Sequence, residues 1–458
     1  MTSRLLRAAA ALLAFSFLAA ASAGVDAQPS TAAGSSPPPG PPPGSPPGLD
    51  RSSPVPAINA FAADLYRRLA DREGNLFFSP ASLVTALAMT YGGARGRTAA
   101  EMAEVLHLPG GAEDPASSPS DRPTPSRSSD PAGVHASFGR LLHALTEPRE
   151  VPVYDREAGK TTHAPAYDLE IANALWVQRD FALREEFLSL VRQHYGAGAS
   201  PVDFRDAPAA RDRINAWAAE ATRDKIRDLI PPGLLDSQTR LVLTDAIYFR
   251  SNWEHEFLPS ATDEAEFRLA SAGGPVRVPM MHAQREYRYA EDNRLQAVEL
   301  PYLEGELALV VLLPRAVDGL GEIERNLTGD GLRQTLDGLE PETVQLSLPR
   351  FRFESAFLLS EVLQAMGMAS AFSDTADFSG MTGEAQLQIG EVVHKAFVAL
   401  DEKGTEAAAA TAVIEKLGAA MTAPEPVGFT ADHPFLFLIR HQASGAILFL
   451  GRVADPRA

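Results

Sequence analysis

Residues 398–421, with the sequence VALDEKGTEAAAATAVIEKLGAAM, place the strongest constraint on how this chain folds. The segment begins like a strand and then crosses a charged turn at residues 401–404. The four alanines that follow favour a helix, whereas Thr405, Thr411 and Val413 favour a strand. The segment therefore has no single preferred secondary structure, and its conformation depends on what surrounds it.

Residues 1–23 have the pattern of a secretory signal. Arg4 and Arg7 give a charged start, residues 8–21 form a short apolar run, and residues 21–23 (Ala-Ser-Ala) form a small-residue cleavage site. A membrane-spanning anchor is the weaker alternative, because alanine dominates the run and no later stretch approaches the ~20 apolar residues that a span needs. We expect export, to the extracellular space or the periplasm, with no membrane contact after cleavage.

Three further segments are predicted to lie outside the core. Residues 24–56 are rich in proline, glycine and serine, which predicts a disordered spacer, with a ligand for a proline-binding domain as the alternative. Residues 110–133 are rich in serine, proline and aspartate and predict a disordered insertion. Residues 147–167 are expected to form an irregular loop. The folded domain should span residues 57–458, enough for one large core or two modest ones.

Composition excludes several classes of chemistry. The chain has no cysteine, which rules out disulfides, thiolate catalysis and cysteine-ligated metal, so its stability must come from packing. Its formal net charge of −18 argues against nucleic acid or an anionic membrane surface as a partner.

Helical and strand-like patterns alternate unevenly along the folded part, which predicts a mixed α+β domain. Ser79 and Pro80 form the cap and first turn of a helix, and Thr98 with Glu101 matches a capping box for the next one. Other helices are predicted at residues 58–69, 184–194, 208–223, 319–327 and 355–366.

The sequence lacks the short motifs of common enzyme classes. It has no G-x-S-x-G, H-E-x-x-H or G-x-G-x-x-G, and its ten histidines show no metal-ligand spacing. A catalytic triad built from scattered residues stays open on sequence order alone. We expect no enzyme activity, no cofactor and no metal.

Five stretches, in this order along the chain, resemble the serpin family of serine protease inhibitors over essentially all of residues 57–456. They are NLFFSPASLVTALAMTYGGARGRTAAEM (75–102), IANALWVQ (171–178), LVLTDAIYFRSNWEHEF (241–257), VHKAFVALDEKGTEAAAATAV (393–413) and DHPFLFLIR with GAILFLGRVADP (432–456). The resemblance implies three β-sheets, eight or nine helices and an exposed reactive loop at residues 402–431. With the signal, it suggests an exported member of bacterial type.

In inhibitory serpins, a protease cleaves this loop and is held as an acyl-enzyme while the loop enters the largest sheet as a new central strand. The resemblance thus explains the mixed preferences of residues 398–421. On insertion, Thr405, the alternate alanines and Val413 would face inward, and Glu406 would stay in water. The same alternation places Glu415 inward, where a carboxylate needs a partner or an exposed end. The implied hinge comprises Glu402, Lys403, Gly404, Thr405, Glu406, Ala407, Ala408, Ala409, Ala410 and Thr411.

The resemblance also implies residues that control sheet opening. Asp245 stands where asparagine is commoner in the family, so a pH-sensitive ionic contact with His394 is expected. A guard at the top of the sheet would be formed by Trp253 and by an ion pair of Glu402 with Arg350. The implied control residues are Ser79, Ser82, Asp245, His394, Trp253 and Arg350.

Counting from Gly404 as in the family places the cleaved bond between Gly418 and Ala419, within a window that includes Leu417, Ala420 and Met421. The window has no arginine, which favours elastase-, subtilisin- or chymotrypsin-like serine proteases as covalent partners over trypsin-like ones. The expected protein is a monomeric, single-use protease inhibitor. A non-inhibitory serpin that acts as a binding or carrier module is the alternative, but the small residues after Gly404 favour inhibition.

Overall fold

The computed structural model describes residues 53–109, 131–155, 160–196, 198–270, 274–383, 387–405 and 425–457. The expected signal (1–23), nearly all of the spacer (24–56) and most of the insertion (110–133) lie outside these residues. So do the hinge residues 406–411 and the whole cleavage window 417–421. The first helix among the described residues starts at Val55, two residues before the expected start of the domain.

The described residues form ten α-helices and three short 3₁₀ helices, one α-helix more than the family resemblance implies because brief turns such as Ser379–Thr382 count as helices. The α-helices are α1 (Val55–Leu69), α2 (Pro80–Tyr91), α3 (Gly96–Val105), α4 (Pro131–Thr146), α5 (Glu185–Tyr195), α6 (Ala207–Ala221), α7 (Leu320–Arg325), α8 (Gly329–Asp337), α9 (Ser360–Met366) and α10 (Ser379–Thr382). The 3₁₀ helices are η1 (Pro259–Ala261), η2 (Leu303–Gly305) and η3 (Ser370–Phe372).

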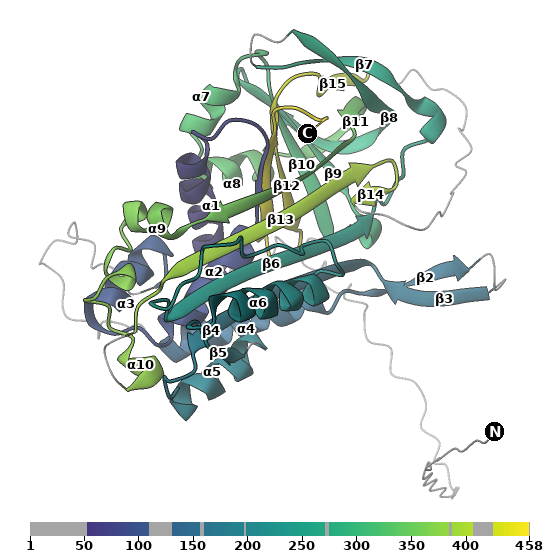
Figure 1. The fold of residues 1–458 in the computed structure, drawn as a ribbon. Helices are drawn as coiled ribbons and strands as arrows, with labels where there is room; N and C mark the ends of the chain where they lie inside the picture. Colours follow the sequence, from purple (N-terminus) through teal and green to yellow (C-terminus); the bar gives the residue numbers. More distant parts are fainter. Residues whose placement is uncertain are drawn as a thin grey trace, which may run out of the picture. The chain divides into compact units, whose positions relative to one another are not determined.

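Three sheets lie among the described residues, in agreement with the predicted mixed α+β fold (Figure 1). The six-stranded sheet has the order β12-β13-β14-β6-β4-β5. Its strands are β4 (Tyr167–Gln178), β5 (Ala199–Val202), β6 (Leu241–Asn252), β12 (Phe351–Leu358), β13 (Glu391–Asp401) and β14 (Gly404–Thr405).

The nine-stranded sheet has the order β1-β17-β16-β10-β9-β8-β11-β15, and β7 pairs with β8. Its strands are β1 (Leu76–Phe78), β7 (Thr262–Arg268), β8 (Pro275–Glu291), β9 (Leu295–Pro301), β10 (Leu307–Pro314), β11 (Glu340–Pro349), β15 (Val427–Thr430), β16 (Phe435–His441) and β17 (Ile447–Val453).

The third sheet is a hairpin of β2 (Glu150–Asp155) and β3 (Lys160–Pro165), so the expectation of an irregular loop at residues 147–167 was wrong. Pro152 and Pro165 hide the strand pattern in the sequence. Both are tolerated because each strand of a two-stranded sheet has a free edge. The hairpin projects from the end of β4 (Figure 1).

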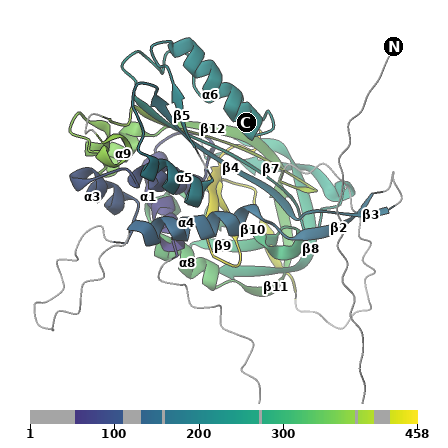
Figure 2. The same cartoon turned by 90° about the horizontal axis from the view of Figure 1, so that it is seen from below.

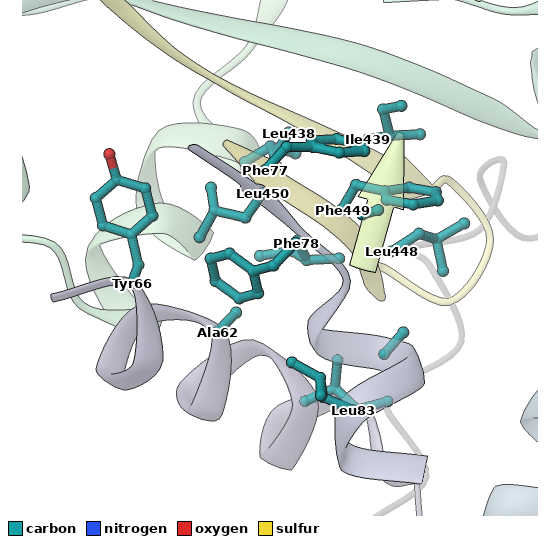
Figure 3. Close-up of a cluster of buried hydrophobic side chains, with 14 of the residues drawn as sticks. Ala62, Tyr66, Phe77, Phe78, Leu83, Leu438, Ile439, Leu448, Phe449 and Leu450 are labelled. Atoms are coloured by element: carbon teal, nitrogen blue, oxygen red, sulfur yellow. The ribbon is translucent and has the colours of Figure 1, made fainter. Parts of the chain in front are cut away.

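The main core lies between the two larger sheets. Helix α2 is buried along almost its whole length because it is apolar on all sides, and the Ser79 side chain caps it by accepting a hydrogen bond from the Ser82 N–H. Figure 3 shows Phe77 and Phe78 of β1 between α1 and strands β16 and β17. The ring of Phe77 stacks on that of Phe449 with centroids 5.0 Å apart.

A second, smaller core lies on the opposite face of the six-stranded sheet. There Ile214 and Ala218 of α6 pack on Trp176, Val242 and Val393. Figure 2 shows α6 on one side of this sheet, with α4 and β10 on the other. The six-stranded sheet is therefore covered on both faces, so separating its strands must disturb packing on each side.

Candidate functional site at the opening of the six-stranded sheet

Strands β6 and β13 run parallel and separate at one end. They pair from Glu391 with Val242 to Ala396 with Ile247, and no rung follows. Nearer the end of the sheet, β14 lies between them, with Gly404 opposite Asn252 of β6 and Asp401 of β13. The chain after the turn has thus begun a new antiparallel strand inside the sheet. The sheet that it enters has six strands and is not the largest, contrary to the expectation.

Gly404 occupies a position that only glycine fits. Its φ is 153°, a conformation that L side chains rarely adopt. A Cβ atom there would lie 2.1 Å from the Ser251 carbonyl oxygen and 2.7 Å from the Cα of Asn252. The close approach lets the first residue of β14 lie against β6.

Thr405 points into the core, on the side that the alternation predicts. It is buried, and its hydroxyl lies 2.6 Å from the hydroxyl of Tyr302. Burial raises the pKa of the Tyr302 phenol, so this group stays protonated. A small hydroxyl-bearing side chain satisfies the site, whereas a large charged one would have to displace the Tyr302 ring.

The turn before β14 is held by a buried carboxylate. Glu402 is 6% exposed, forms an ion pair with Arg350, and accepts a 2.7 Å hydrogen bond from the Thr262 hydroxyl. Burial on its own would raise the pKa of Glu402, but the bonds from Arg350 and Thr262 outweigh it and hold this pKa below its usual value. The pair expected from the sequence is therefore brought together, with Glu402 ionised.

Trp253 ties the same turn to the rest of the sheet. Its indole N–H donates to the Asp401 carbonyl at 2.9 Å, and its backbone N–H donates to the Lys403 carbonyl at 2.8 Å. Its ring stacks on Tyr302 with centroids 4.6 Å apart and an interplanar angle of 9°. Trp253 thus contacts the base of the loop directly.

Four of the expected control residues form one buried polar cluster further along the seam between β6 and β13. His394 and Asp245 are opposite each other in the β13–β6 register, and Nδ1 of His394 lies 2.5 Å from Asp245. Nε2 of the same ring accepts a 3.1 Å hydrogen bond from the Ser79 N–H. The Ser79 hydroxyl donates to the Leu448 carbonyl at 2.6 Å. The cluster joins α2 to both strands that must separate.

Asn173 belongs to this cluster, and sequence reasoning missed it. It lies opposite Asp245 in the β4–β6 register. Its side-chain oxygen accepts from the Ser82 hydroxyl, and its amide donates to the Ser82 carbonyl, each at 3.1 Å. The only sequence signal is a polar residue inside the apolar stretch IANALWVQ.

The donor at Ser79 determines the protonation of His394. Because a backbone N–H points at Nε2, this nitrogen carries no proton, and Nδ1–H donates to Asp245. The ring is then neutral, so the contact is a hydrogen bond rather than the expected ionic one. The other carboxylate oxygen of Asp245 has no hydrogen-bond partner among the described residues. An acidic group thus lies incompletely satisfied in the seam.

Within the described ranges, no group of three or more histidine, aspartate or glutamate side chains is placed to hold a metal ion. In the same ranges, no helix is long and apolar enough to cross a membrane.

The fold and this arrangement identify the class of protein. The profile of the serpin family, described as serine protease inhibitors, matches residues 56–456. The chain therefore belongs to the serpin family and has the serpin fold. The chain therefore belongs to a family described as protease inhibitors, which is not a family of enzymes.

Individual relatives cover nearly the same region. The chain is 42% identical over 405 residues to a serpin-like protein of Thermococcus kodakarensis, covering 88% of this chain and 86% of the relative. It is 39% identical over 410 residues to the leukocyte elastase inhibitor of Bos taurus, covering 86% and 97%. Human thyroxine-binding globulin in complex with thyroxine superposes with a TM-score of 0.73 at 28% identity, covering 89% and 100%.

Proposed function

We propose that this serpin is an exported, single-use inhibitor of serine endopeptidases. The protease cleaves between Gly418 and Ala419, or within residues 417–421, and becomes trapped as an acyl-enzyme when the cleaved loop enters the six-stranded sheet. The observation that carries the proposal is the position of β14, because Gly404 and Thr405 already lie between β6 and β13.

The energetics favour completing the strand. Adding about a dozen residues between β6 and β13 forms roughly a dozen ladder hydrogen bonds, each contributing about 1 kcal/mol. This sum is comparable to the whole stability of a typical domain, about 5–15 kcal/mol. The intact form is then metastable, and cleavage releases the free energy that distorts the protease.

The target is an elastase-, subtilisin- or chymotrypsin-like protease, because the window Leu417, Gly418, Ala419, Ala420 and Met421 offers only small or apolar anchors. The relation to a bovine leukocyte elastase inhibitor supports the elastase-like choice. Residues 1–23 direct export, which brings the inhibitor to such proteases outside the cell.

Incubation with a panel of these proteases tests the proposal. A complex that survives denaturing electrophoresis is expected, together with a released C-terminal fragment whose mass identifies the cleaved bond. Catalytic turnover with no stoichiometric limit would point to a hydrolase instead. Cleavage without any covalent complex would support the second candidate function.

That second candidate is a non-inhibitory binding or carrier protein. The likeness to a globulin whose structure contains thyroxine is the observation in its favour. The glycine, threonine and alanines of residues 404–410 weigh against it, because they are small enough to pass into a sheet.

A further inference from the structure

The end of α6 has an uncommon backbone. After the buried Thr222, both Arg223 (φ 51°) and Asp224 (φ 65°) adopt the left-handed conformation, which is unfavourable for residues other than glycine. Hydrogen bonds hold the turn in place, including Lys225 N–H to the Thr222 carbonyl at 3.0 Å. The turn therefore presents two exposed cations, Arg223 and Lys225, from a fixed backbone over the six-stranded sheet.

Arg223 attaches the turn to the β4–β6 side of the sheet. Its guanidinium donates to both carboxylate oxygens of Asp168 on β4, at 2.9 and 3.3 Å, and lies 3.8 Å from Glu170. It also lies over the ring of Tyr248 on β6, at 5.2 Å from the centroid. These contacts attach the Arg223 side of the turn to β4 and β6, on one side of the seam between β6 and β13.

Lys225 attaches the turn to the other side. Its ammonium lies 5.7 Å from the ring centroid of Phe397 on β13. Arg352 of the neighbouring strand β12 also lies over this ring, at 5.2 Å. The Lys225 contact is close to the ~6 Å limit of a cation–π interaction, so a small displacement of the ring would break it.

Tyr248 and Phe397 lie at the point where β6 and β13 separate. The last paired rung joins Ala396 to Ile247, and the next residues along the two strands are Phe397 and Tyr248. The turn of α6 thus spans the first unpaired rung, with one cation on each side.

We infer that Arg223 and Lys225 form a clasp over this rung that slows strand insertion, an inference that rests on the proposed function. An inserted strand moves β13 away from β6 by about one strand spacing, ~4.8 Å. Since Arg223 is held by Asp168, the turn stays with β4 and β6, and the contact of Lys225 with Phe397 is lost. The clasp therefore raises the activation barrier for strand insertion and does not change the stability of the final inserted state.

The test follows insertion without a protease. A fluorescent synthetic peptide with the sequence of residues 405–416 is added to the intact protein, and its annealing rate is measured by anisotropy. Lys225→Met and Phe397→Leu should each anneal about two- to fivefold faster than wild type. The double variant should be no faster than the faster single variant, because both changes remove the Lys225–Phe397 contact, whereas the Arg352 contact with this ring lies within the paired strands β12 and β13. Arg211→Met, on α6 before the turn and paired with Asp212, should anneal at the wild-type rate.

Wild-type rates in both single variants would overturn the clasp, and so would multiplicative effects in the double variant, which would show that the two residues act separately. If the peptide anneals neither to wild type nor to any variant, strand insertion itself is contradicted. The proposed function then fails, and the clasp fails with it.

Discussion

Asp245 and His394 face each other across the β6–β13 seam at 2.5 Å, and only one carboxylate oxygen is used. A neutral histidine offers this carboxylate a single donor, and the second oxygen is buried without a partner among the described residues. Leaving a buried charged group incompletely satisfied is costly. The intact seam is thus destabilised at the cluster that links it to α2.

Asp245→Asn should therefore stabilise the intact protein. The amide oxygen still accepts from His394, and the remaining unsatisfied group is neutral. We expect the free energy of unfolding to rise by about 1–2 kcal/mol, measured by urea denaturation. Asp330→Asn, at an exposed carboxylate, is the control. A decrease in stability would show that the charge is satisfied in a way that the present contacts do not include.

His135 should make the protein sensitive to acid. Burial, and secondarily the nearby His194, lower the pKa of His135 to about 4, whereas an unperturbed histidine titrates near 6.5. Between these values the unfolded chain binds a proton that the folded chain does not. The free energy of unfolding should therefore fall as the pH drops from about 6.5 to about 4, by roughly 2–4 kcal/mol from this group.

Urea denaturation from neutral pH to about pH 4.5 measures this effect. His135→Gln should lose less stability over that range than wild type, because it removes the titrating ring. His143→Gln, at an exposed histidine of the same helix, should follow wild type. Identical pH profiles for wild type and His135→Gln would refute the assignment.

Arg350→Ala should weaken the base of the loop. Among the described residues, it leaves Glu402 buried with only the Thr262 hydroxyl as a side-chain partner, so the intact form should lose about 1–3 kcal/mol. Thermal denaturation measures the loss, and Arg333→Ala, at an exposed position of α8, is the control. If the two variants have the same melting temperature, the ion pair of Arg350 with Glu402 contributes no more to stability than a surface contact does.

Gly404→Ala should expel β14 from the sheet. The added methyl group cannot fit 2.1 Å from the Ser251 oxygen, so the backbone must move. We expect more protease-cleaved product and less covalent complex per molecule, measured by the stoichiometry of inhibition. Gly428→Ala, where a Cβ would meet nothing within 4 Å, should behave as wild type. Equal stoichiometry in the two variants would show that β14 is not the start of insertion.

Thr405→Arg should convert the inhibitor into a substrate. The arginine cannot enter the buried site beside Tyr302, so the cleaved loop would stall and the protease would be released. Gel electrophoresis should show cleaved protein without a covalent complex. Thr430→Arg on an exposed position of β15 provides a matched control. Covalent trapping by Thr405→Arg would contradict insertion as the mechanism.

Local sequence patterns predicted many helices and strands, but they did not show where contacts with distant segments override a local preference. The cap at Ser79 and the start at Pro80 were confirmed, because the Ser79 hydroxyl can accept from the Ser82 N–H while it donates to the Leu448 carbonyl. The capping box at Thr98 was wrong, because α3 begins at Gly96. Thr98 accepts from the Asp377 N–H, and Glu101 accepts from the Ser370 N–H, so distant segments use both side chains.

The helix expected at residues 355–366 was half wrong. Strand β12 continues to Leu358, and α9 starts only at Ser360. The alternating burial of residues 351–358 follows their pairing with β13, a partner some 40 residues away that a local pattern does not reveal. The same limit applies to the site. Motifs predicted Ser79, Asp245 and His394 together, but the place of Asn173 depends on the β4–β6 register.

The last part of the chain lies deep in the molecule. Every residue of β16 and β17 is buried, and these strands pair with β10 on one side and β1 on the other. A nick in residues 417–421 would sever the covalent link to them but none of these contacts. The nicked protein should therefore migrate as one particle in gel filtration, heavier than before by only the water added in hydrolysis. Only a denaturant would separate the two pieces.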